Sequence, residues 1–322
     1  MAKEIFPTTI VGSYSKPDYL NDAFKEYYAG KISHEQLHKL AEKAIVDVIK
    51  DHEEADVDIV SDGEMRRSEM TEFFAENIGG FKMFGPVRVW GNNYYQKPSI
   101  IEKMTYKKPI LVDEYNYTKS LTKKRIKVPI TGPYTIVDWS FNEAYRNKEE
   151  AIYALAEIEN RELKALVKAG VDFIQIDEPA LSTHPEEIEI ARKAIEITTK
   201  GIDVKKGLHI CYGEYDKIYP AVLDFNVDQI DLELANRKWD IDFLKEHEFT
   251  KEIGYGACDV HNPRVETVEE IVAGVRKGLE LVSPEKLFVK PDCGLKMLPR
   301  NIAFEKLKVM VKAAKVLRKE FE

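Results

Sequence analysis

The feature that most constrains the fold is a regular alternation of short apolar runs with longer amphipathic segments. The runs are rich in β-branched and aromatic residues, which is typical of buried strands. The predicted strands are Thr8–Ser13, Val57–Ser61, Val128–Thr131, Phe173–Ile176, Gly207–Ile210, Asp228–Leu232, Glu252–Gly256 and Leu287–Lys290. Eight strands separated mostly by helices in a chain of 322 residues predict an α/β protein with a (β/α)8 (TIM) barrel fold. A doubly wound open sheet is the alternative.

The segments between these strands carry helical patterns. In Ser33–Ala55 the apolar residues recur every three or four positions, and Ser33 with Gln36 matches a capping box. A long amphipathic helix is predicted over Lys148–Ala169, ended by Gly170. Further helices are predicted over Glu186–Thr199, Ile241–Glu246, Val265–Leu281 and Asn301–Lys319.

The chain is predicted to form a single catalytic barrel domain over residues 1–322, with a long insertion after the second strand. The insertion covers roughly residues 65–124 and is rich in aromatic residues and lysine, without a clear period. Its only strand signals lie near Val87–Trp90 and Ile110–Val112. The sequence does not indicate what the insertion does.

Polar or reactive side chains follow strand after strand. A (β/α)8 barrel carries its catalytic groups just beyond the C-terminal ends of its strands, so these side chains are predicted to share one face. The residues concerned are Ser13, Glu64, Trp139, Asp177, His209, Cys211, Glu233, His261 and Cys293.

His209 and Cys211 form the most specific pair among them. They lie two positions apart at the end of a predicted strand, so both side chains point to one face of the sheet. An imidazole and a thiolate on one face make half of a tetrahedral metal site. A buried cysteine beside a hydrogen-bonded histidine is the alternative interpretation of this pair.

Composition excludes several classes of function. Lys and Arg number 48 and Asp and Glu 56, giving a net charge of −8 with no long basic run, so nucleic acid is not an expected partner. The sequence has no apolar run of membrane-spanning length and no signal-peptide core in MAKEIFPTTI, so we expect a cytoplasmic protein without membrane contact. Three cysteines, an odd number in a long chain, indicate reduced thiols.

Eight short motifs carry a family resemblance. They are TTIVGSY, SDGE, ITGPYTIVDWSF, FIQIDEPAL, LHICYG, QIDLE, GACDVHNP and VKPDCGLK. In this order, across nearly the whole chain, they resemble the C-terminal catalytic barrel of cobalamin-independent methionine synthases. Members of that family transfer a methyl group to the sulfur of zinc-bound homocysteine, which forms methionine. The resemblance therefore implies a methyltransferase of methionine biosynthesis with Zn²⁺ as its cofactor.

The resemblance assigns the zinc ligands to His209, Cys211, Glu233 and Cys293. Two thiolates, one imidazole and one carboxylate also suit Zn²⁺ better than hard cations on chemical grounds alone. Ligands drawn from separate strand ends favour a catalytic metal over a structural one. The third cysteine, Cys258, receives no ligand role and is interpreted as a packed thiol near the site.

The remaining site residues are assigned to substrates. Glu64 and Asp177 resemble the pair that binds the homocysteine ammonium group, with Ser13 near the carboxylate and Trp139 as an aromatic platform for the methyl donor. His261 is the candidate for proton delivery to a folate nitrogen. Simpler interpretations stay open for each. They are a salt bridge from Arg66 or Arg67 to Glu64, one from a neighbouring lysine to Asp177, a core tryptophan and a hydrogen-bonded loop histidine. Glu178 is predicted to point away from the side that Asp177 faces.

The methyl donor is left open by the resemblance. Family members that use methyltetrahydrofolate polyglutamate are about twice as long and have a second barrel, whereas this chain matches the catalytic half. It also reads DEPALSTHP where longer members carry arginine and glutamate after the leucine. Methylcobalamin on a corrinoid partner protein is therefore as plausible a donor as 5-methyltetrahydrofolate.

Two other classes of function remain as alternatives. One is a zinc methyltransferase for a different thiol, such as coenzyme M, although a sulfonate thiol has no ammonium group for Glu64 and Asp177. The other is a non-catalytic barrel that binds zinc.

Overall fold

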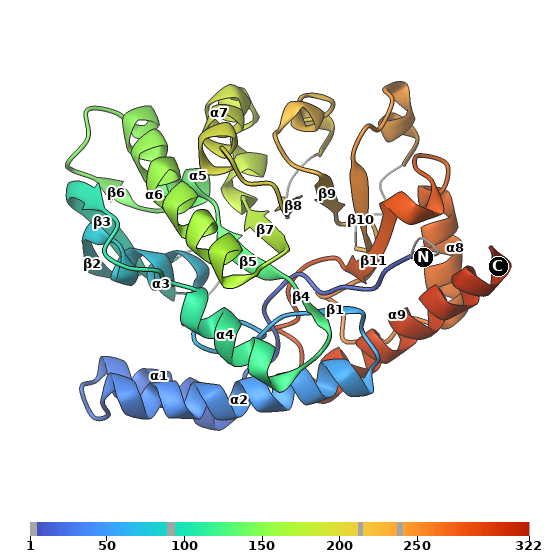
Figure 1. Cartoon of the computed structure of the whole chain (residues 1–322), viewed down its shortest axis with the longest axis horizontal. Coiled ribbons are helices and arrows are strands. Elements are labelled where there is room, and N and C mark those ends of the chain that lie inside the picture. Colours follow the sequence, from blue (N-terminus) through green and yellow to red (C-terminus); the bar gives the residue numbers. More distant parts are fainter. Residues whose placement is uncertain (1–4, 89–93, 212–214, 237–240, 322) are drawn as a thin grey trace. The chain divides into compact units, whose positions relative to one another are not determined.

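The computed structural model describes residues 5–88, 94–211, 215–236 and 241–321. The chain forms two compact units. Unit 1 comprises Met1–Arg66, Glu114–Val128 and Gln229–Glu322, and unit 2 comprises Arg67–Asp113 and Pro129–Asp228. Figure 1 labels the helices and strands of both units.

Unit 1 contains a continuous parallel ladder. Strand β9 (Gln229–Leu232) pairs with β10 (Glu252–Cys258), which pairs with β11 (Leu287–Pro291). The first predicted strand is reduced to two parallel bridges, in which Thr8 pairs with Val289 and Thr9 with Ile59. Strand β1 (Ile59–Val60) then pairs with β4 (Arg125–Ile126), also in parallel.

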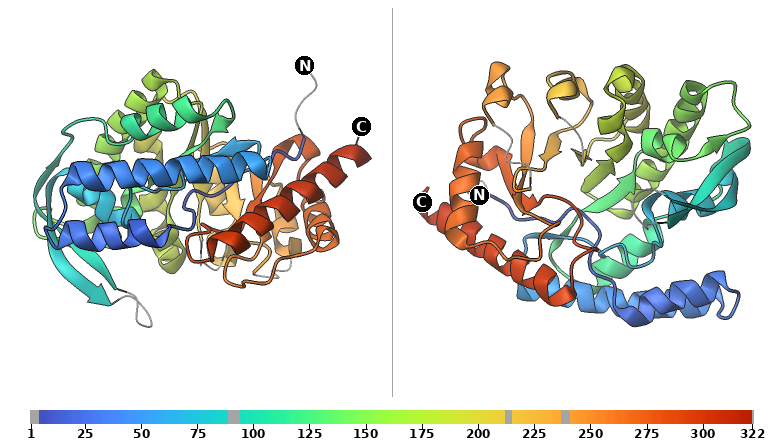
Figure 2. Two further views of the ribbon diagram at one scale, coloured as in Figure 1. Left: turned by 90° about the horizontal axis from the view of Figure 1, so that it is seen from below. Right: turned by 180° about the vertical axis from the view of Figure 1, so that it is seen from behind.

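Unit 1 includes the helices α1 (Asp18–Tyr28), α2 (His34–Glu54), α8 (Val268–Gly278) and α9 (Arg300–Glu320). Of these, α8 and α9 contact β10 of the ladder. Helices α1 and α2 lie side by side (Figure 2), and α9 contacts α8 and α2. The predicted capping box is confirmed. The Ser33 hydroxyl accepts from the Gln36 backbone N–H at 3.2 Å, and Oε1 of the Gln36 side chain accepts from the Ser33 backbone N–H at 2.8 Å.

Unit 2 carries three neighbouring strands, β5 (Val128–Thr131), β7 (Phe173–Asp177) and β8 (Lys205–His209). Strands β7 and β8 run parallel, with Asp177 opposite His209. The helices here are α5 (Pro133–Asp138), α6 (Lys148–Ala169) and α7 (Ile188–Thr198). Helix α6 has the predicted bounds and ends at Gly170, whose φ of 102° lies in the left-handed region that favours glycine.

The segment predicted as an insertion has a defined structure. It contains α3 (Met70–Asn77), an antiparallel ribbon of β2 (Gly79–Arg88) and β3 (Tyr94–Thr105), and α4 (Val112–Leu121). A short strand that follows α5, β6 (Phe141–Asn142), extends the ribbon beside β3. Val87 lies in a strand as predicted, whereas Trp90 is outside the described residues.

One predicted strand is wrong. Ile110–Val112 is not a strand, because the Ile110 and Leu111 N–H groups donate to the Glu162 carboxylate and helix α4 starts at Val112. The short helix predicted over Ile241–Glu246 is confirmed, as a 3₁₀ helix. Within the described residues, no helix is both long and apolar enough to cross a membrane.

Candidate active site

In unit 2 the parallel register brings two predicted site residues side by side. Asp177 ends β7 and His209 ends β8, and the two are partners across the ladder, so their side chains leave the sheet on the same face. The Glu178 N–H donates to the His209 carbonyl at 2.9 Å, which ties the two strand ends together. Both side chains are buried, and the Gln175 amide donates to Asp177 Oδ1 at 2.7 Å.

Cys211 follows on the same backbone segment. A ring nitrogen of His209 and the Cys211 sulfur lie within 4.8 Å of each other, and both residues are buried. The Ser182 hydroxyl donates to the Cys211 carbonyl at 3.2 Å, and the Tyr215 hydroxyl donates to the Ile210 carbonyl. The predicted pair therefore has the geometry of two adjacent metal donors on a restrained backbone.

Trp139 follows helix α5 and is half-buried. Its carbonyl accepts from the Tyr95 hydroxyl of β3 at 2.9 Å, and the two ring centroids are 6.5 Å apart. The ribbon of the predicted insertion thus holds the segment that carries Trp139. Burial raises the pKa of Tyr95 to about 12, which keeps its hydroxyl protonated as a donor.

Glu178 holds the start of α5. Its fully buried carboxylate accepts from the Tyr134 N–H at 3.0 Å and the Thr135 N–H at 2.7 Å. Burial raises the pKa of Glu178 to about 7, although the hydrogen bonds from Thr135 and Tyr134 act in the opposite direction. A Cβ atom at Gly132 would overlap this carboxylate, so a glycine is required there.

In unit 1 the loops that carry Ser13 and Glu64 are joined to each other. The Ser61 hydroxyl donates to the Gly12 carbonyl at 2.9 Å and accepts from the Gly63 N–H at 3.1 Å. Glu64 has a positive φ of 58°, an uncommon conformation for a residue with a side chain. Its N–H donates to Asp62 Oδ1 at 2.9 Å, which fixes this turn.

The salt bridge considered between Glu64 and Arg66 is replaced by another pair. Arg66 contacts the Glu42 carboxylate of α2 at 3.2 Å. Glu64 is half-buried and lies four residues beyond β1.

Glu233 and Cys293 occupy the ends of β9 and β11 in unit 1. Glu233 is fully buried, whereas Cys293 is half-buried. The loop after Cys293 is joined to the Ser13 loop, because the Leu295 N–H donates to the Ser13 carbonyl at 2.8 Å. The structure therefore connects the loops of Ser13, Glu64 and Cys293 within this unit.

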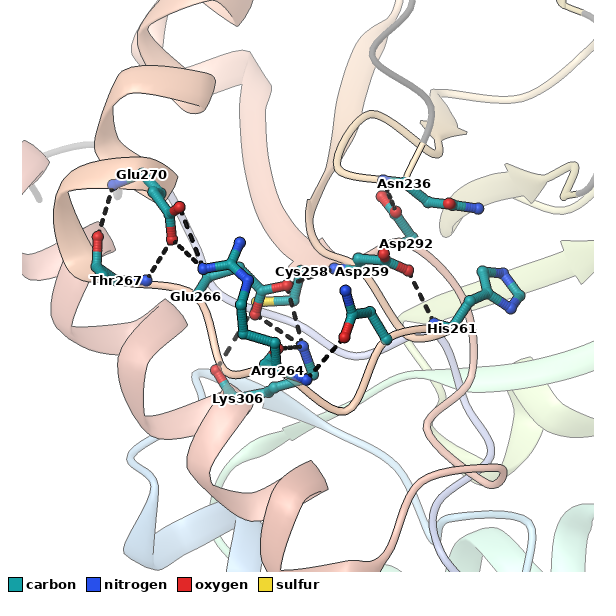
Figure 3. A network of polar contacts seen from close by, with 11 residues as sticks. Asn236, Cys258, Asp259, His261, Arg264, Glu266, Thr267, Glu270, Asp292 and Lys306 are labelled. Carbon is teal, nitrogen blue, oxygen red and sulfur yellow. Dashed lines mark hydrogen bonds and ion pairs between the residues drawn. The ribbon is translucent and has the colours of Figure 1, made fainter.

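His261 lies on an exposed turn after β10. Its N–H donates to Asp259 Oδ1 at 2.8 Å, and the Asp259 N–H donates to Glu266 at 2.9 Å. Glu266 forms an ion pair at 2.9 Å with Lys306 of α9, whose side chain is fully buried. Figure 3 shows how this chain of contacts ties the His261 turn to α9.

Cys258 differs from the other two cysteines. It is fully buried, and its thiol donates to the Lys306 carbonyl of α9 at 3.8 Å. Burial raises the pKa of this thiol well above its ordinary value, so it stays protonated. These contacts agree with the interpretation of Cys258 as a packed thiol.

The chain has parallel strands that alternate with helices, and polar side chains follow the C-terminal ends of these strands. This arrangement is typical of (β/α)8-barrel enzymes. Residues 6–316 match the family model described as "Cobalamin-independent synthase, Catalytic domain". The chain belongs to this family and is a methyltransferase. The predicted fold class and the predicted family are both confirmed.

Related proteins support this assignment over the whole chain. A protein named methionine synthase from Sulfurisphaera tokodaii is 49% identical over 99% of this chain and 94% of its own length. One from Pyrococcus horikoshii is also 49% identical, over 100% and 96%. Among solved structures, a B12-independent methionine synthase from Shewanella sp. W3-18-1, in complex with selenomethionine, aligns with a TM-score of 0.89 at 27% identity, covering 99% of each chain.

Proposed function

We propose that the protein transfers a methyl group to the thiolate of L-homocysteine, forming L-methionine, with a zinc ion held by His209, Cys211, Glu233 and Cys293. The observation that carries the proposal is the juxtaposition at the ends of β7 and β8. There, an imidazole and a thiol suited to a soft metal lie one strand away from Asp177, a carboxylate suited to an ammonium group.

The donor set supports zinc in particular. Two thiols, one imidazole and one carboxylate match the ligand types that zinc takes, and hard cations such as Mg²⁺ rarely take sulfur. Three of the four side chains are buried, which limits competition from water. When bound, zinc supplies a thiolate at neutral pH, where a free thiol with a pKa near about 8.5 is mostly protonated.

Different residues of the chain bind the two charged groups of homocysteine. Asp177 and Glu64 bind the ammonium group of homocysteine, and Ser13 with its neighbouring backbone binds the carboxylate. The Shewanella structure contains selenomethionine, an analogue of the proposed product, which supports an amino-acid site in this family. A thiol without an amino group should therefore be a poorer methyl acceptor.

Trp139 and His261 act on the methyl donor. The half-buried Trp139 ring provides a flat apolar face for the donor, and the exposed His261 delivers a proton to a folate nitrogen when a folate is used. We propose methylcobalamin on a corrinoid protein as the preferred donor. Its methyl group is more labile than that of methyltetrahydrofolate, and its transfer needs no proton from His261.

The experiment is methionine formation from L-homocysteine, measured in parallel with methylcobalamin and with monoglutamate 5-methyltetrahydrofolate. We expect product with methylcobalamin and at most slow turnover with the folate. His261→Ala should reduce the folate reaction by roughly 100-fold or more and the cobalamin reaction much less. Cys258→Ser serves as the matched control and should retain activity.

The outcomes separate the parts of the proposal. Efficient turnover with the free folate and none with methylcobalamin would reverse the choice of donor. Equal methylation of homocysteine and of coenzyme M would remove the amino acid as the specific substrate. No methylation of any thiol with either donor would overturn the proposed function.

A further inference from the structure

Asp292, the residue before Cys293, has an unusual set of contacts. Its carboxylate is fully buried and accepts three backbone hydrogen bonds from the loop that follows Glu233. The donors are the N–H groups of Leu234 at 2.9 Å, Ala235 at 3.0 Å and Asn236 at 2.6 Å. Figure 3 shows the Asp292 side chain directed toward Asn236. One carboxylate thus joins the two segments of unit 1 that carry proposed zinc ligands.

A buried ion pair connects strands β9 and β11 shortly before these two segments. Lys290 of β11 and Asp231 of β9 are both fully buried, with Nζ and Oδ2 3.6 Å apart. Lys290 Nζ also donates to the carbonyls of Pro291 at 3.2 Å and Asp292 at 3.3 Å. Asp231 lies two residues before Glu233, and Lys290 lies three residues before Cys293. Strands β9 and β11 are therefore tied together just below both proposed ligands.

Two glycines make these contacts sterically feasible. Strand β10 lies between β9 and β11, and a side chain on it would separate them. A Cβ atom at Gly254 would overlap Asp231 Oδ1, and one at Gly256 would overlap Asp292 Oδ1. The Gly-Tyr-Gly sequence of β10 therefore leaves the space in which side chains from its two neighbours approach each other.

We propose that Asp292 is a positioning residue for the metal site, which fixes the Glu233 loop and the Cys293 turn relative to each other before any metal binds. The inference rests on the zinc ligation proposed above. A buried carboxylate that accepts three backbone N–H groups makes strong hydrogen bonds, and losing it would leave those donors without their acceptor. Outer contacts of this kind restrict ligand orientation and so raise metal affinity.

The test compares the zinc affinity of wild type, Asp292→Asn and Gly256→Ala by competition with a chelator. Asp292→Asn keeps the shape but places an NH₂ group against a backbone donor, and Gly256→Ala displaces the carboxylate. We expect zinc affinity to fall roughly 10- to 100-fold in each variant. Amide hydrogen exchange at Leu234–Asn236 should accelerate in the zinc-free form of Asp292→Asn, which a role confined to global stability would not produce.

Asp58→Asn is the matched control. Asp58 accepts from the Thr8 N–H at 2.7 Å in the same unit, but it precedes β1 and so lies at the opposite end of the strands. This variant should lose thermal stability and keep the zinc affinity of the wild type. If Asp292→Asn and Gly256→Ala both bound zinc with wild-type affinity, this inference would be wrong, whereas the proposed function would stand. A wild type that binds no zinc would overturn the proposed function and this inference with it.

Discussion

The surroundings of each sulfur distinguish the three cysteines. Cys211 lies beside a histidine nitrogen, Cys293 follows the buried Asp292 carboxylate, and Cys258 packs under α9 with a raised pKa. A thiol that stays protonated in an apolar environment is a poor metal ligand, whereas a thiol beside an imidazole donor is a good one. The three residues should therefore respond differently to the same substitution.

Cys211→Ser and Cys293→Ser should each reduce bound zinc from about one ion per chain to a small fraction. The fold should persist, because the apolar core supplies the stability of the barrel. Elemental analysis of zinc with far-UV circular dichroism measures both quantities. Cys258→Ser is the control and should retain zinc, and full zinc occupancy in both ligand variants would refute the assignment.

The two carboxylates assigned to the ammonium group lead to a second prediction. Asp177→Asn or Glu64→Gln should weaken homocysteine binding by about 2–3 kcal/mol, the scale of a lost charge-assisted hydrogen bond in a closed site. Zinc content should not change. Calorimetric titration measures the affinity, with the surface substitution Glu189→Gln on α7 as a control. Unchanged affinity in both variants would give the pair another role.

At the scale of elements, helix α2 carries a buried histidine that links folding to pH. His52 is completely buried, and its ring lies edge-on to the Tyr14 ring with centroids 5.2 Å apart. Burial lowers the pKa of His52 from 6.5 to about 4, an effect that the neighbouring Asp51 carboxylate partly offsets. The folded state therefore favours neutral His52, and the unfolded state binds the proton more tightly.

The stabilisation from neutral His52 is present above the unfolded-state pKa of 6.5 and is lost as pH falls toward about 4. From pH 7 to pH 4, the free energy of unfolding of the wild type should decrease by about 3 kcal/mol more than that of His52→Gln. Urea unfolding at the two pH values measures this difference. His34→Gln, at an exposed position at the start of the same helix, should follow the wild type, and parallel profiles for all three proteins would contradict the prediction.

The elements that the sequence predicted well are those with local signals. Ser33 with Gln36 fixed the start of α2, and Gly170 fixed the end of α6. The β2–β3 ribbon had a weaker signal, near Val87, because the residues from Phe81 to Arg88 only alternate between half-buried and exposed positions and none is buried. The strand predicted at Ile110–Val112 failed because its N–H groups bond to Glu162, a residue about fifty positions away in the sequence.

In the candidate active site, too, local sequence signals predicted some features and missed others. The strand-end rule of a barrel predicted Asp177 and His209 at the ends of their strands, where the structure has them, and the roles of these residues stay predictions. Asp292 was missed as a positioning residue, although it stands beside a predicted ligand in the motif VKPDCGLK. Its role depends on contacts with a loop more than fifty residues earlier, which no local pattern encodes. A carboxylate adjacent to a predicted ligand is the signal that would have pointed to it.

At the scale of the whole molecule, the chain matches its family from residue 6 to residue 316 and matches its relatives along nearly their full length. The four proposed zinc ligands are spread over the sequence at His209, Cys211, Glu233 and Cys293. The prediction of a single catalytic domain over residues 1–322 stays a prediction. The central claim is therefore that four residues distant in the sequence hold one zinc ion to which homocysteine binds through sulfur.

X-ray absorption at the zinc edge tests this claim most directly, because it counts the sulfur atoms around the metal. We predict about two sulfur ligands at roughly 2.3 Å in the resting protein, from Cys211 and Cys293, and about three after L-homocysteine is added. Homoserine, which carries a hydroxyl in place of the thiol, should leave the count unchanged. A sulfur count that does not rise with homocysteine, in a protein that holds its zinc, would contradict the account.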